Sequence, residues 1–72
     1  MMPLLMLGNG ETCEVARVKG LPEVKQHLSD MGFVPGSKVT VVQSQNGNMI
    51  VKILDAKVAL TKEMAAKIQV VR

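Results

Sequence analysis

Residues 21–36 constrain the fold most, because they predict a short helix that stops at a glycine and leads into a tight turn. Pro22 suits the first helical position, since its fixed φ matches a helix and its missing N–H would be unpaired there. Glu23 adds negative charge where the helix dipole favours it. Apolar residues then recur at spacings of three and four, which predicts an apolar stripe on a helix over residues 22–31, formed by Leu21, Val24, Leu28 and Met31. Each would contribute roughly 1.5–3 kcal/mol to the stability if fully buried.

The end of this helix has a specific expected geometry. Gly32 follows the last apolar position and can adopt the left-handed conformation that closes a helix. Phe33 and Leu28 then occupy the two positions that usually touch in a Schellman cap. Pro35 and Gly36 fit the central positions of a type II turn, because proline fixes φ and glycine accepts a positive φ. We therefore interpret these five residues as structural.

A long strand is predicted before the helix, over residues 11–19. Cys13 and Val15 alternate onto its inner face. Val18 is out of phase with them, so we expect a β-bulge near residues 16–17 that returns it to the inner face. The strong local twist of a bulge suits a small barrel.

Short antiparallel strands are predicted after the turn. They cover residues 37–44, 49–54, 58–60 and 68–70, with connections at 45–48 and 55–57. Asn46 and Gly47 form the strongest short hairpin signal, and Thr61 can cap a helical turn near residues 62–66. Residues 3–7 fit either a further short strand or an arm laid over the core. Five or six short strands with one inserted helix predict a mainly β fold that closes as a small barrel, because closure removes exposed edges.

Composition narrows the class of protein. Seventy-two residues predict one domain over residues 1–72, and an apolar share of 47% is enough for a packed core. The sequence shows no secretory signal and no apolar run near the 20 residues that a membrane span needs. A single cysteine, Cys13, favours the reducing cytosol over secretion. The net charge is +3, but the lysines are spread among acids, which is typical of a mixed solvated surface.

Catalytic and metal-binding patterns are weak. No paired carboxylates, nucleophile–base pair or phosphate loop occurs, so we assign no catalytic and no cofactor-binding residues. A metal site needs three or four well-placed ligands, and no spacing joins His27 to Cys13. We assign no metal site; weak or transient binding of Fe²⁺ or another divalent ion, with His27 and Cys13 as the weak candidates, stays open.

The best candidate for a functional surface lies on the two hairpin strands. Their inner face is formed by Val39, Val41, Met49, Val51 and Ile53. Val42, Ile50 and Leu54 then fall on the outer phase, flanked by Lys38 and Lys52. Either another part of the fold covers these apolar residues or they form an exposed patch that binds a partner protein. Both interpretations stay open at this point, and the protein-docking patch is our functional hypothesis.

The order and spacing of several segments resemble the FeoA family, small cytosolic proteins of bacterial ferrous iron uptake. The matching residues are Leu28, Met31, Gly32, Phe33, Pro35, Gly36, Val39 and Val41, then Val58, Ala59, Leu60, Ala65, Ile68, Gln69 and Val70, and before them Gly10, Val15 and Val18. The resemblance implies an SH3-like barrel and a non-enzymatic accessory role in iron transport. The implied partner is the FeoB membrane transporter, through its cytosolic GTP-binding domain, which places the chain in the cytoplasm at the inner face of the membrane.

Two alternatives remain open at this point. A small barrel can bind single-stranded nucleic acid by stacking bases on aromatic residues, but the chain has no Trp or Tyr, so we expect no nucleic-acid partner. The barrel also resembles the SH3-like domain of iron-dependent repressors, which would make it a metal-dependent regulatory module. Weak self-association and weak transition-metal binding are the remaining expectations. No membrane insertion is expected.

Overall fold

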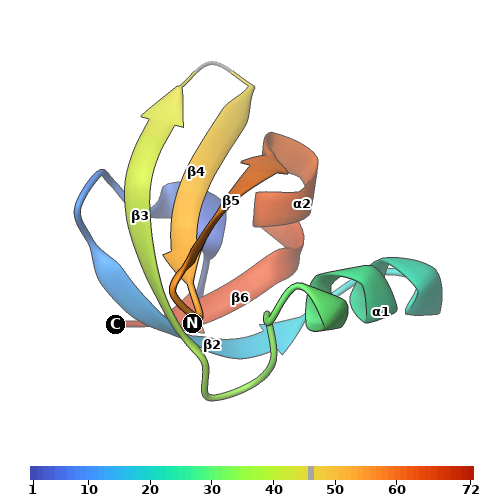
Figure 1. The fold of residues 1–72 in the computed structure, drawn as a ribbon. Coiled ribbons are helices and arrows are strands. Elements are labelled where there is room, and N and C mark those ends of the chain that lie inside the picture. The colour runs from blue at the N-terminus through green and yellow to red at the C-terminus, as the bar shows by residue number, and fades with distance from the viewer. Residues whose placement is uncertain (46) are drawn as a thin grey trace.

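The computed structural model describes residues 1–45 and 47–72, and in them it contains six strands, two α-helices and one 3₁₀ helix (Figure 1). In chain order the elements are β1 (Met2–Pro3), η1 (Leu4–Met6), β2 (Thr12–Val18), α1 (Pro22–Asp30), β3 (Lys38–Gln45), β4 (Asn48–Ile53), β5 (Ala56–Thr61), α2 (Lys62–Lys67) and β6 (Ile68–Val71). Of the predicted segment 3–7, Pro3 thus ends a very short strand, residues 4–6 form a helical turn, and Leu7 follows that turn in an extended conformation. Asn46, part of the predicted hairpin turn, lies outside the described residues.

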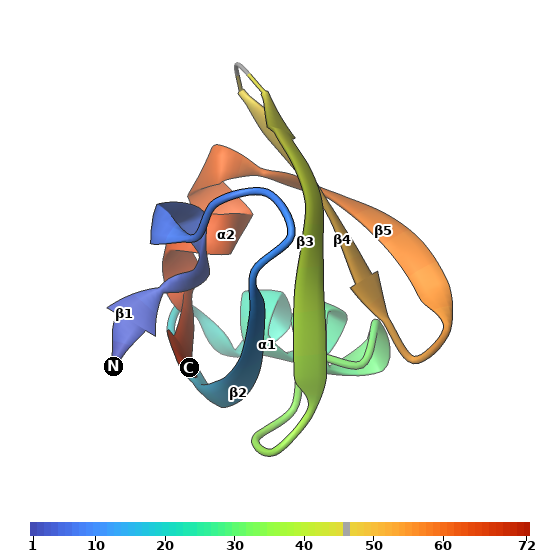
Figure 2. The ribbon, with the colours of Figure 1, turned by 90° about the vertical axis from the view of Figure 1, so that its left-hand side faces the viewer.

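All six strands belong to one antiparallel sheet in the order β1-β6-β2-β3-β4-β5. The sheet curls around its core, with β2 pairing β3 on one side and β6 on the other (Figures 1 and 2). Mainly β architecture with one helix inserted after the first long strand is as the sequence predicts. The sheet is barrel-like, as predicted, but its hydrogen-bonded ladder does not close, because β1 and β5 remain as edges in the described residues.

Two bulges shape the sheet. The β2–β6 register shifts between Val15 and Arg17, which confirms the bulge predicted near residues 16–17. This shift pairs Val18 with Ile68 and leaves Val18 half-buried against the core. A second shift, between Val41 and Gln43 of β3, was not predicted.

The inner faces of the strands and one helical turn at the N-terminus build the core. All five residues assigned to the inner face of the hairpin are buried, with Val39, Val41 and Val51 at 0% exposure. Leu4 and Leu7 are also buried, so the N-terminal segment acts as the arm over the core that the sequence left as one alternative. Other buried members are Cys13, Val15, Leu28, Phe33, Leu60, Ala65, Ile68 and Val70.

Helix α1 projects from the side of the sheet (Figure 1). Pro22 is its first residue, and Leu21 precedes it without a side-chain capping bond. Of the predicted apolar stripe only Leu28 is fully buried, whereas Leu21 is 71% exposed. The full burial of all four stripe residues is therefore not realised, because one end of α1 extends away from the sheet.

The Schellman cap at the end of α1 is confirmed. The Phe33 N–H donates to Leu28 O at 3.0 Å, and the Gly32 N–H donates to Ser29 O at 2.9 Å. Gly32 has φ +104°, the left-handed conformation that this cap requires. Phe33 and Leu28 are 1% and 0% exposed, so the cap also anchors the helix to the core.

The turn before β3 agrees with the sequence prediction, whereas the turn between β4 and β5 does not. The type II turn at Pro35 and Gly36 is confirmed: Ser37 N–H donates to Val34 O at 3.0 Å, and Gly36 has φ +94°. The connection predicted at residues 55–57 is wrong. The turn is the pair Leu54–Asp55, with φ +51° and +64°, the pattern of a type I′ turn.

This earlier turn lengthens the following strand. β5 runs for six residues, Ala56–Thr61, rather than the three expected, and pairs with β4 along its whole length. The capping prediction for the next helix is confirmed, since Thr61 Oγ1 accepts a hydrogen bond from the Met64 N–H at 3.2 Å. Helix α2 then packs near η1 and leads directly into β6 (Figure 2).

Candidate partner-binding surface

The outer face of β3, β4 and β5 carries polar and basic side chains at regular positions. Thr40 of β3 is opposite Lys52 of β4, which is opposite Lys57 of β5. Lys38 lies two residues before Thr40, so it is a diagonal neighbour of Lys52 on the same face. Because alternate residues of a strand share a face, the three lysines form one row, which we call the lysine row: Lys38, Lys52 and Lys57.

The apolar members of the predicted surface fall at two separate places. Val42 is the residue skipped by the second bulge and is 39% exposed, while the neighbouring Ile50 is half-buried and pairs with Gln43. Leu54 is not on the strand but in the turn beyond it, and it is 73% exposed. It lies roughly 13 Å further along β4 than Ile50, at about 3.3 Å per residue. The surface is therefore a strip with an apolar group at each end.

Leu54 lies against the cap of α1. A Cβ built on Gly32 would be 2.7 Å from Leu54 Cδ1, so the leucine side chain covers the glycine. Leu54 also has a positive φ, a conformation that residues other than Gly, Asn and Asp rarely adopt. An exposed apolar side chain on a strained backbone is the kind of feature that gathers at binding sites.

The sequence does not predict the strand position of Lys57 or the turn position of Leu54. It places Lys57 in a connection, whereas in the structure Lys57 is in β5 opposite Lys52. The signal that could have located the turn is Asp55, since Asp tolerates left-handed conformations. This signal is weakened by the preceding Leu54, because leucine is unusual in a type I′ turn.

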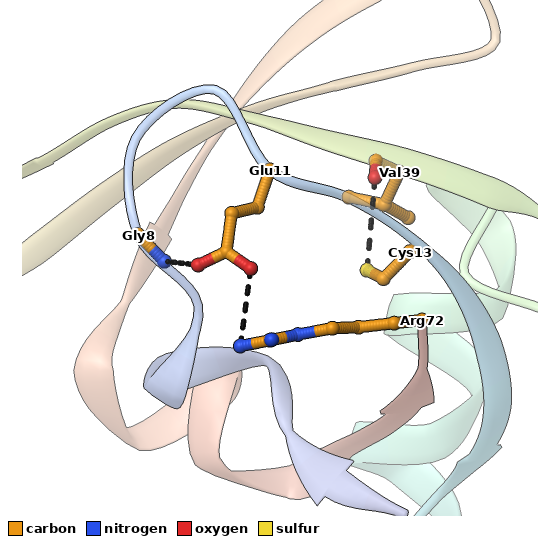
Figure 3. A network of polar contacts seen from close by, with 5 residues as sticks. All are labelled: Gly8, Glu11, Cys13, Val39 and Arg72. Carbon is orange, nitrogen blue, oxygen red and sulfur yellow. Dashed lines mark hydrogen bonds and ion pairs between the residues drawn. The ribbon is translucent and has the colours of Figure 1, made fainter.

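Cys13 is buried at 3% exposure, and its thiol donates to Val39 O at 3.6 Å (Figure 3). Burial raises the pKa of the Cys13 thiol, and the negative charge of Glu11 raises it further. The thiol is therefore protonated at neutral pH, and the thiolate is the reactive form.

Glu11 joins the N-terminal turn to the last strand. Its carboxylate accepts a hydrogen bond from the Gly8 N–H at 2.8 Å and lies 3.1 Å from Arg72 Nη2 (Figure 3). A shallow hollow of about 230 Å³ opens beside this pair and is lined by Thr12, Cys13, Glu14, Lys38, Val71 and Arg72. Sequence reasoning gave no role to Glu11.

His27, the other weak metal candidate, is exposed in the last turn of α1, whereas Cys13 is buried in β2. The structure does not bring the two together. Within residues 1–45 and 47–72 no group of three or more His, Cys, Asp or Glu side chains is placed to hold a metal ion.

No helix of the described residues is long and apolar enough to cross a bilayer. The curled six-stranded antiparallel sheet and its inserted helix define a small barrel-like β domain. Its fold is shared with a zinc complex of Stenotrophomonas maltophilia FeoA, described as a prokaryotic SH3 domain protein (TM-score 0.87, 24% identity, covering 97% of this chain and 89% of that one).

The sequence comparison specifies the family. The FeoA domain model matches residues 2–72, and the chain belongs to this family. It is 33% identical over 70 residues to a putative Fe²⁺ transport protein A of Methanocaldococcus jannaschii, covering 97% of this chain and 85% of that protein. It is 37% identical over 71 residues to an Fe²⁺ transport protein A/FeoB fusion protein of Porphyromonas gingivalis, of which it spans only 8% while 96% of this chain is covered.

Solved structures agree with this assignment. The crystal structure of an iron uptake regulatory protein, FeoA, superposes with a TM-score of 0.92 at 27% identity, covering 97% of this chain and 95% of that one. A manganese-dependent transcriptional repressor contains the same fold at a TM-score of 0.88 and 28% identity, covering 96% of this chain but 40% of the repressor.

Proposed function

We propose that the chain is a non-enzymatic accessory protein of ferrous iron uptake that docks on the cytosolic GTP-binding part of a FeoB-type transporter and supports its assembly or activity. The observation that carries the proposal is the P. gingivalis fusion, in which a segment 37% identical to this chain shares one polypeptide with FeoB. Fusion keeps two domains at a high effective concentration, which benefits domains that act on each other. The proposed location is the cytoplasmic face of the membrane, reached through the partner.

The strip formed by Val42, Ile50, Leu54, Lys38 and Lys52 supports this proposal as the docking surface. Leu54 and Val42 offer exposed apolar area at its two ends, at 73% and 39% exposure. Lys52 is exposed between them, and Lys38 is exposed at the Leu54 end. Apolar contacts would supply most of the affinity, and the lysines would steer an acidic partner surface toward the strip.

The test is an NMR titration of the ¹⁵N-labelled chain with the cytosolic domain of its cognate FeoB, with and without guanine nucleotide. We expect saturable shifts at the amides of the strip, with weaker binding at high salt because exposed charges are screened. The absence of shifts in every nucleotide state would overturn the proposal. Shifts confined to another face would retain the function and reassign its surface.

A matched pair of leucine variants sharpens this test. Leu54→Asn removes an apolar side chain that is 73% exposed, and Asn suits the left-handed conformation at that position. Leu21→Asn removes a leucine that is 71% exposed, at the first position before α1, where Asn is also favoured. Only Leu54→Asn should weaken binding, by about tenfold or more. Equal effects of the two variants would exclude a specific role for Leu54.

A second candidate is a metal-dependent regulatory module or a nucleic-acid-binding barrel, which the likeness to part of a manganese-dependent repressor favours. Our proposal assigns neither a resident metal nor a nucleic-acid ligand to this chain. Titration with Fe²⁺ under reducing, anaerobic conditions and with single-stranded DNA should give at most weak binding. Stoichiometric Fe²⁺ binding at submicromolar concentration would favour the second candidate.

A further inference from the structure

One edge of the sheet is open. β5 pairs only with β4, and in the described part of the chain no other strand lies against its second side. β5 follows the outer margin of the molecule in the side view (Figure 2). Ala56, Lys57 and Ala59 are exposed and Val58 is half-buried, so the first four residues of this edge are accessible. The other edge, β1, has only two residues.

The hydrogen-bonding pattern of the β4–β5 hairpin shows which backbone N–H and C=O groups of β5 point away from β4. A two-residue type I′ turn makes Ile53 and Ala56 a hydrogen-bonded pair, and bonded and non-bonded pairs then alternate along an antiparallel ladder. The bond from Lys62 N–H to Gly47 O, at 3.2 Å, agrees with this phase. Lys57 and Ala59 therefore direct their N–H and C=O groups away from β4. An added strand could bond to all four groups.

The charges at this edge are unbalanced. Lys57 is directly opposite Lys52 in a non-bonded pair, where side chains approach closely and like charges are destabilising. The one ion pair within residues 1–45 and 47–72 joins Arg72 to Glu11, so neither lysine is paired. Asp55, in the adjoining turn, makes no ion pair with them. The fold thus holds two positive charges together beside free backbone groups.

From these observations we infer that the β5 edge is a binding site for an extended acidic segment of a partner protein, which adds to the sheet as a seventh strand. A residue opposite Lys57 would place its side chain on the outer face next to Lys57, with Lys52 one strand further along the same row, so an acid fits there. The next residue would lie beside half-buried Val58, where an aliphatic side chain fits. Ala59 is small and leaves room for a second acid. The recognised pattern is acid–aliphatic–acid.

The charges of Lys52 and Lys57 also disfavour binding of a second copy of this chain at the β5 edge. A second copy of β5 would bring its own Lys52 and Lys57 toward this pair, on the same face of the joined sheet. Lysine on an edge strand is a common protection against such self-pairing. This site goes beyond the proposed docking on a transporter, since it depends on the chemistry of the added segment and not on which protein supplies it.

The test uses the synthetic peptide Gly-Glu-Val-Glu-Val-Glu-Gly and a grouped isomer, Gly-Glu-Glu-Glu-Val-Val-Gly, titrated into the ¹⁵N-labelled chain. We expect shifts at the amides of Lys57 and Ala59 with the alternating peptide, and binding at least about fivefold weaker for the isomer, because only the alternating peptide places acids on one face. Equal binding of the two peptides, or shifts confined to other elements, would overturn the inference.

Two pairs of variants separate charge from backbone recognition. Lys57→Glu should weaken binding by about tenfold, whereas Lys25→Glu, the same change on α1, should have little effect. Ala59→Pro removes an N–H that faces away from β4, which an edge strand tolerates. It should abolish binding, whereas Ala59→Ser should retain it, and the dispersed ¹⁵N spectrum reports that each variant is folded. Unchanged binding by a folded Ala59→Pro chain, or a stable dimer of the free chain in sedimentation that Ala59→Pro abolishes, would contradict the site.

Discussion

At Gly32 both the backbone conformation and a neighbouring side chain disfavour any residue with a Cβ. Gly32 has φ +104°, and a Cβ there would be 2.7 Å from Leu54 Cδ1. Gly32→Ala should lower the free energy of unfolding by about 1–2 kcal/mol for the left-handed backbone, and by more for the displaced leucine. Gly32→Val should be worse, because β-branched residues are poorly tolerated at positive φ. Chemical denaturation monitored by circular dichroism measures both effects.

Gly36 supplies the control for this prediction. Its φ is +94°, but a Cβ there would meet nothing within 4 Å. Gly36→Ala should therefore show the backbone cost alone, and Gly32→Ala should be the more destabilising of the two. Adding Leu54→Ala to Gly32→Ala should remove the excess. An unchanged melting temperature for Gly32→Val would contradict the cap that both the sequence and the structure assign.

Cys13 should give the stability a defined pH dependence. Because the folded state raises the thiol pKa above its ordinary value of 9.0, the unfolded chain loses this proton first as pH rises. The stability from the buried neutral thiol is therefore complete below that pH and is lost progressively above it. Cys13→Ala lacks the effect, so the stability difference between wild type and variant should shrink above pH 9.0. A constant difference from pH 7 to 10.5, measured by denaturation, would exclude this linkage.

Helix α2 is only six residues long, so its N-terminal cap should contribute measurably to its stability. Thr61→Ala removes the oxygen that accepts from the Met64 N–H, and should cost about 1 kcal/mol. Thr61→Ser keeps the oxygen and should retain most of the stability. If the alanine and serine variants have the same melting temperature, the hydroxyl is not the capping group.

Elements with a local chemical cause were predictable from the sequence. The Schellman cap at Gly32, the turn at Pro35 and Gly36, and the bulge in β2 each follow from residues close together in the chain. The start of β5 was not predictable, because Leu54 adopts a left-handed conformation that its own side chain disfavours. That one turn decides whether Lys57 belongs to a connection or to a strand beside Lys52.

At the scale of the whole molecule, the inward and outward faces of the hairpin followed from alternation, but the arrangement of the edges did not. Pairing between β2 and β6 joins residues about fifty positions apart, and periodicity carries no information on such pairs. The candidate strip could therefore be predicted residue by residue for Val42, Ile50, Lys38 and Lys52. The place of Leu54 at the far end of the strip, and the continuation of the lysine row to the β5 edge, depend on the turn at Leu54 and Asp55 and could not be predicted.

The N-terminal segment completes the core, since Leu4 is fully buried although only a helical turn of three residues holds it. Leu4→Ala should cost about 2–5 kcal/mol, the range for a buried leucine. A chain of 72 residues has a total stability of roughly 4–11 kcal/mol, so this one change could remove half of it. Met6→Ala, in the same turn but 66% exposed, should change the stability by less than about 0.5 kcal/mol. If thermal denaturation shows equal losses for the two variants, the segment is an appendage and the sheet, even with its β1 and β5 edges open, is stable without it.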